Sequence, residues 1–126
     1  MAVVTIYVSR NGNSNNLKLR DSEGHGNGTD NITTDVGPGD SVQWELDTNS
    51  NLAALNAVSK TVPGDPSFDA NSQDLLTSIT SSNGVFTGLV VSPSPGKGKY
   101  EKYKIAFMVP NSNEIFWDDP KLQMDV

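Results

Sequence analysis

Apolar and polar residues alternate along much of this chain of 126 residues. In the clearest run, residues 100–109, every second position is apolar: Tyr103, Ile105, Phe107 and Val109. Because successive side chains of a strand point to opposite faces, a period of two predicts a half-buried strand. The same pattern, or a short apolar run, predicts further strands at residues 4–8, 17–20, 32–36, 41–46, 52–58, 85–91 and 121–126.

One segment has a different period. Phe68, Leu75, Leu76 and Ile79 recur at helical spacing, which predicts a short helix within residues 72–81, capped by the polar residue at position 71 or 72. Polar turns rich in Asn and Gly separate the predicted strands. We therefore expect an all-β fold: an antiparallel two-sheet sandwich of about eight strands with one short helix.

The length of the chain favours one domain, residues 1–126, and its composition excludes several kinds of site. The chain has no cysteine, which excludes disulfides, thiolate metal sites and a cysteine nucleophile. Its formal net charge of −6 argues against binding to nucleic acid or to an anionic membrane, because both require a concentrated positive face. The sequence shows neither a membrane-spanning apolar run nor a secretory leader, so we expect a cytoplasmic protein. Export after removal of a leader is the alternative.

Residues 39–44 follow a glycine-rich turn and read Gly-Asp-Ser-Val-Gln-Trp. They resemble the Gly-Asp-x-Val-x-Trp strand of cupredoxins, and residues 103–107 resemble the strand that leads into the copper-binding loop of that family. The resemblance implies a cupredoxin-like sandwich. The positions of the copper Cys and His fall near Phe107 and Pro110, and the only histidine is His25. Since blue copper needs a thiolate and two imidazoles, copper is excluded as a cofactor.

Residues 115–122 read Ile-Phe-Trp-Asp-Asp-Pro-Lys-Leu. They resemble the terminal aromatic-Asp-Pro strand of the bacterial AidA/PixA inclusion-body proteins, although this chain has a second aspartate, with both Asp118 and Asp119 present. That family includes sugar-binding lectins and proteins that accumulate as inclusions. The resemblance therefore implies carbohydrate binding or self-assembly.

The same terminal segment offers the residue types of a sugar site. An aromatic ring packs against the apolar face of a pyranose, while Asp and Asn exchange hydrogen bonds with its hydroxyl groups. We expect the ligand-binding set to be Trp117, Asp118, Asp119, Asn111 and Asn113. The alternative is structural: Trp117 packs in the core, as Trp44 is expected to, and the two aspartates form a turn before Pro120.

A candidate metal site lies in a glycine-rich segment. Its expected ligands are Asp21, Glu23 and Asp30. His25 and Asn27 lie between them, so that potential ligands alternate along a flexible loop, as Ca²⁺ binding requires. The alternative is an exposed loop made of ordinary turn residues.

The residues do not favour catalysis. The chain has one histidine, within the glycine-rich segment, and its pattern favours no pair of carboxylates for acid–base chemistry. We therefore expect a non-catalytic protein that binds carbohydrate, with or without calcium. The alternative is a structural protein that acts through homo-oligomerisation.

Overall fold

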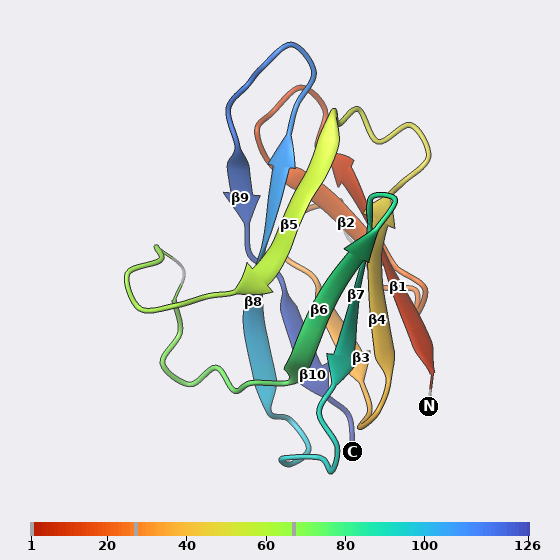
Figure 1. Ribbon diagram of the computed structural model, residues 1–126, viewed down its shortest axis with the longest axis vertical. Coiled ribbons are helices and arrows are strands. Elements are labelled where there is room, and N and C mark those ends of the chain that lie inside the picture. The colour runs from red at the N-terminus through yellow and green to blue at the C-terminus, as the bar shows by residue number, and fades with distance from the viewer. Residues whose placement is uncertain (1, 27, 67) are drawn as a thin grey trace.

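The computed structural model describes residues 2–26, 28–66 and 68–126, and over these ranges the chain is all-β. The described ranges contain no helix, and hence none long and apolar enough to cross a membrane. Ten strands are formed (Figure 1): β1 (Val3–Arg10), β2 (Leu17–Asp21), β3 (Thr33–Val36), β4 (Ser41–Leu46), β5 (Ala54–Lys60), β6 (Leu76–Ser82), β7 (Val85–Val90), β8 (Tyr100–Met108), β9 (Phe116–Asp118) and β10 (Lys121–Met124).

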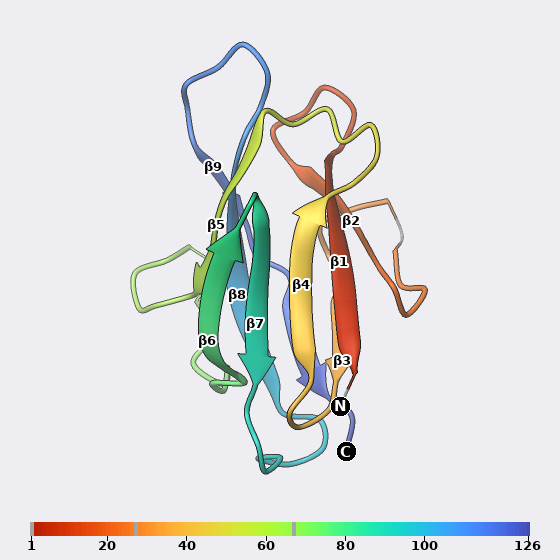
Figure 2. The ribbon, with the colours of Figure 1, turned by 45° about the vertical axis from the view of Figure 1, so that its right-hand side comes forward.

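The strands form two mixed sheets of five strands each. The first sheet has the order β2-β1-β4-β7-β6. The second has the order β3-β10-β8-β5, and β9 pairs with β8 off this path. The two sheets lie in separate layers, a sandwich-like arrangement that is visible in Figure 2.

Two strand pairs are parallel, β1 with β4 and β3 with β10. The expectation of a purely antiparallel sandwich is wrong in this respect. The chain crosses from one sheet to the other after β2, β3, β4, β5 and β7. A strand that returns after such crossings can lie beside an earlier strand in the same direction, and the alternation within one strand carries no information about this.

The interior between the sheets is filled by residues that the alternating pattern assigns to the inner faces. Trp44 on β4 and Tyr103 on β8 are fully buried, and their rings meet edge to face with centroids 5.4 Å apart. The indole Nε1–H of Trp44 donates a hydrogen bond of 3.1 Å to Tyr103 Oη. This contact joins the two sheets and confirms the core position of Trp44.

The predicted helix within residues 72–81 is wrong, because this region enters β6. On β6, Leu76 pairs with Val90 and Ile79 with Gly88, with a register shift at a bulge between Leu76 and Ser78. The extra residue in the bulge puts two apolar residues three positions apart on one face, which imitates helical spacing. The alternating pattern predicts neither β6 nor the short β9, which accounts for ten strands in place of eight.

Candidate functional site

Trp117 lies on the outer face of the second sheet. β9 pairs antiparallel with β8, which sets Trp117 opposite Ala106. The preceding residue, Phe116, packs against Phe107 with ring centroids 5.9 Å apart, so alternation along β9 turns Trp117 outward. Trp117 is 50% exposed. The alternative interpretation of Trp117 as a core residue is therefore wrong.

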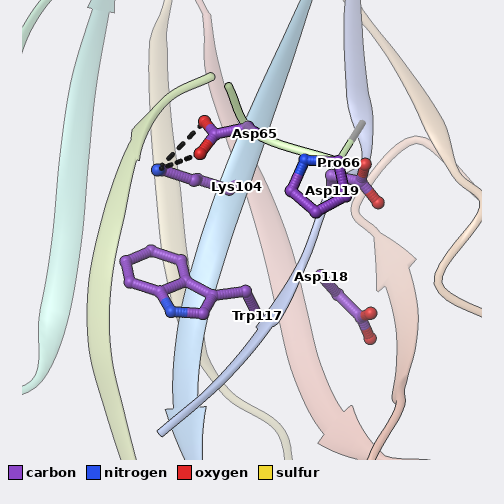
Figure 3. Close-up of a pocket in the computed structure, with 6 residues that line it drawn as sticks. All are labelled: Asp65, Pro66, Lys104, Trp117, Asp118 and Asp119. Carbon is purple, nitrogen blue, oxygen red and sulfur yellow. Dashed lines mark hydrogen bonds and ion pairs between the residues drawn. The ribbon is translucent and has the colours of Figure 1, made fainter. Parts of the chain in front are cut away.

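Lys104, on the outer face of β8, contacts both Trp117 and a distant loop (Figure 3). Its Nζ lies 4.8 Å from the centroid of the Trp117 ring, within the range of a cation–π contact. The same ammonium forms an ion pair with Asp65, 3.1 Å from Oδ2. Asp65 also accepts a hydrogen bond from the N–H of Val62, and this bond, followed by the one from Lys104, lowers the pKa of Asp65.

These side chains line an open groove of about 360 Å³: Asp65, Pro66, Lys104, Trp117, Asp118 and Asp119. Sequence reasoning missed three of them, Asp65, Pro66 and Lys104. Asp65 lies among prolines and a glycine, which are ordinary turn residues, and Lys104 occupies a polar position of an alternating strand, which indicates exposure to solvent. Neither pattern indicates that the β5–β6 connection folds back onto β8.

The adjacent aspartates have different partners. Asp118 is buried, and its Oδ2 accepts a hydrogen bond of 2.6 Å from the N–H of Leu17 on β2 in the other sheet. In Figure 3 the carboxyl group of Asp118 points away from Trp117 and Lys104. Asp119 faces Lys102, with Oδ2 3.6 Å from Nζ. Asp118 therefore ties β9 to β2, while Asp119 lines the groove and pairs with Lys102.

Burial is the main cause that raises the pKa of Asp118 to about 7. The N–H of Leu17 favours the charged form and opposes this shift, while the charge of Asp30 and a hydrogen bond with its side chain favour the neutral form. A protonated Asp118 suits both partners, because its hydroxyl group donates to Asp30 while its second oxygen accepts from Leu17.

Asn111 and Asn113 are not brought to the groove. Both are exposed in the loop between β8 and β9, which extends beyond the end of the sheet in Figure 1. Asn111 has a φ of 65°, a left-handed conformation that asparagine tolerates in turns. Of the expected sugar-binding set, Trp117, Asp118 and Asp119 line the groove, although the carboxyl group of Asp118 points away from Trp117.

The expected calcium ligands lie in two separate places. Asp21 and Glu23 cluster with His25, with one potential ligand atom from each within 4.8 Å of the others. Asp30 lies instead against Asp118. Asn27 lies outside the described residues. The expectation that Asp30 shares a site with Asp21 and Glu23 is therefore wrong, because the loop folds its two ends apart.

Protein groups already satisfy the carboxylate of Asp21. Its Oδ1 accepts hydrogen bonds from the N–H groups of Glu23 and His25, at 3.0 and 2.9 Å. Its Oδ2 accepts one of 2.7 Å from the hydroxyl group of Thr34 and lies 2.9 Å from His25 Nδ1, a contact that raises the pKa of His25. Asp21 thus holds the turn after β2, and a cation would have to displace these bonds.

The groove at Trp117 combines three kinds of group on one outer surface. They are an exposed indole ring, the carboxylates of Asp65 and Asp119, and the ammonium of Lys104. Such a set can stack on an apolar ring and exchange hydrogen bonds with hydroxyl groups. No protein-family model matches this chain, and no curated protein matches it in sequence.

Proposed function

We propose that this protein is a non-catalytic carbohydrate-binding protein and that the groove at Trp117 holds the sugar. The observation that carries the proposal is the half-exposed indole of Trp117, set between carboxylates and an ammonium. A pyranose has an apolar face of C–H groups and a rim of hydroxyl groups. The indole suits the first and the charged side chains suit the second.

The polar groups of the groove fit the hydroxyl rim of a sugar. Asp65 and Asp119 accept hydrogen bonds, and Lys104 donates them. The ion pairs of Asp65 with Lys104 and of Asp119 with Lys102 hold these side chains in position before a ligand arrives. Such preorganisation lowers the entropy that binding would otherwise cost.

The carboxyl groups of the groove support binding without catalysis. Hydrolysis of a glycosidic bond needs a protonated carboxyl group and a carboxylate on the two sides of that bond. The lowered pKa of Asp65 keeps it a carboxylate at neutral pH. Asp118 has a pKa raised to about 7, but its carboxyl group is hydrogen-bonded to the N–H of Leu17 and points away from Trp117 and Lys104.

The resemblances in sequence support the same proposal. The cupredoxin-like residues 39–44 extend into β4, where Trp44 is buried, and the AidA/PixA-like residues 115–122 extend through β9 into β10. We propose on these grounds a cupredoxin-like sandwich related to the AidA/PixA proteins. Because four protein groups already contact Asp21, we propose a sugar site that does not use calcium.

A glycan array tests the proposal with three proteins: wild type, Trp117→Ala and Tyr7→Ala. Tyr7 is a matched control, because it is an aromatic residue of the other sheet whose ring lies 4.0 Å from Arg20 Cζ. We expect wild type and Tyr7→Ala to bind the same glycans and Trp117→Ala to bind none. The result should be the same in Ca²⁺ and in EDTA. Silence of the wild-type protein in both conditions would remove the proposal.

Self-assembly is a second candidate function, and the edge strand β6 favours it. β6 ends the first sheet and pairs only with β7 among the described strands. Its sequence, Leu-Thr-Ser-Ile-Thr-Ser-Ser, contains neither a charge nor a proline, the residues that commonly protect an edge from pairing with another chain. Light scattering should then show an oligomer that the edge substitution Thr80→Lys dissociates. A monomer at all concentrations would remove this candidate.

A further inference from the structure

A second hollow adjoins the groove at Trp117. It also has a volume of about 360 Å³, and Asp119 lines both. The side chains that characterise it are polar and come from four different segments: Asp30, Asn31, Asp69, Lys102, Asp119 and Lys121. Of these two spaces, the first, the groove at Trp117, therefore offers an aromatic ring, and the second, the adjoining hollow, offers hydrogen-bonding groups.

The two spaces lie side by side along β8. Lys104 lines the first and Lys102 the second, and the two lysines are two residues apart on the outer face of that strand. This spacing corresponds to roughly 7 Å along a strand. The ion pair of Lys102 with Asp119, at 3.6 Å, marks the boundary. A ligand long enough to cross that boundary would contact both spaces.

The lysines along the two spaces already have partners. Lys104 is paired with Asp65, and Lys102 with Asp119. Lys121 lies over the Tyr100 ring, 4.9 Å from its centroid.

The pKa of Asp69 is lowered, first by the hydrogen bond from Tyr100 and then by other groups that include Lys102 and Lys121. Apart from Asp118, four carboxylates and three lysines line the two spaces. An anionic sugar would therefore meet more negative than positive charge.

We propose that the site takes an uncharged saccharide of at least two units. One unit stacks on Trp117, and the next lies in the second hollow, within reach of the amide of Asn31 and the ammonium of Lys121. This inference rests on the proposed function and adds to it the length and the charge of the ligand.

The probes are arrayed neutral mono-, di- and trisaccharides of glucose, galactose, mannose and fucose, with the same glycans terminated by glucuronic or sialic acid. Calorimetry then compares the monosaccharide and the disaccharide of the strongest series. We expect the disaccharide to bind about tenfold more tightly, because its second unit contacts the second hollow; this gain corresponds to about 1.4 kcal/mol. We expect the terminal acid to weaken binding.

Two variants assign the gain in affinity to the second hollow. Asn31→Ala should weaken binding of the disaccharide about fivefold, the effect of one lost hydrogen bond, and leave the monosaccharide unchanged. Asn15→Ala, an exposed asparagine in the β1–β2 loop, is the matched control and should change neither.

Three results would overturn this inference while leaving the proposed function intact: equal affinity for one and two units, tighter binding of the acidic glycans, or an equal loss for both ligands in Asn31→Ala. Absence of binding to every arrayed glycan has a different meaning, because it removes the proposed function and this inference with it.

Discussion

The ammonium of Lys104 lies 3.1 Å from Asp65 Oδ2 and 4.8 Å from the centroid of the Trp117 ring. Lys104 therefore connects the β5–β6 connection with β9, two segments that are far apart in the chain. The groove between them is thus organised by one side chain of β8. The aromatic ring and the charged groups of this groove are therefore held in place without a ligand.

Truncation of Trp117 should mainly affect sugar binding, whereas truncation of Trp44 should mainly affect stability. Trp117→Ala should abolish sugar binding and lower the free energy of unfolding by only about 1 kcal/mol, because its ring is half-exposed. Trp44→Ala should cost about 3–5 kcal/mol, because its ring is fully buried. Urea denaturation measures both values. A loss at Trp117 as large as that at Trp44 would mean that Trp117 serves the fold.

Lys104→Met tests the charge of the groove while keeping the apolar stem of the side chain. The ion pair with Asp65 is partly exposed, so its loss should leave the free energy of unfolding almost unchanged. Sugar affinity should fall about tenfold, because a charged hydrogen-bond donor is lost. Calorimetry and thermal melting of the same samples separate the two effects. Unchanged affinity would exclude Lys104 as a sugar contact.

Asp118 should make the protein less stable as the pH rises. Its pKa is raised from 3.8 to about 7 in the folded protein, mainly by burial. The stabilisation from the neutral form is therefore complete below pH 4 and is lost as the pH rises through 7.

Asp118→Asn keeps a neutral group at this position at every pH. Between pH 5 and pH 8, wild type should lose on the order of 1–2 kcal/mol more than Asp118→Asn, in urea denaturation at each pH. Equal losses in both proteins would show that Asp118 is not protonated in this range.

Tyr103→Phe should destabilise the protein by about 1–3 kcal/mol, because it leaves the buried Nε1–H of Trp44 without its acceptor. Tyr100→Phe is a matched control. It also removes one hydrogen bond, to Asp69, but Tyr100 is only half-buried and water can replace the lost partner. The difference in urea midpoint between the two variants measures the contact between the sheets. Equal midpoints would contradict this role.

Much of the fold could be predicted from the sequence, because half-buried strands leave a period of two in it. That signal was sufficient for eight of the ten strands. It failed at β6, where a bulge places Leu76 and Ile79 three residues apart on one face. It also could not indicate the parallel pairs, since the direction of a strand depends on how the chain crosses between the sheets.

Less of the candidate site could be predicted. Trp117 and Asp119 belong to a short motif, and their residue types alone suggested contact with a sugar. Asp65 and Lys104 are 39 residues apart, and the pair exists only because a long connection folds back onto β8. Asp118 lies 101 residues from Leu17, so its burial depends on the packing of one sheet on the other.

The most direct test of sugar binding at Trp117 is a titration with neutral saccharides, followed in the ¹H–¹⁵N spectrum of the two indole Nε1–H groups. The chain has two tryptophans, one fully buried and one half-exposed, so each signal reports a different place. A bound saccharide should shift the signal of Trp117 and leave that of Trp44 unchanged. A Trp117 signal that stays fixed with every saccharide at millimolar concentration would contradict sugar binding at this residue.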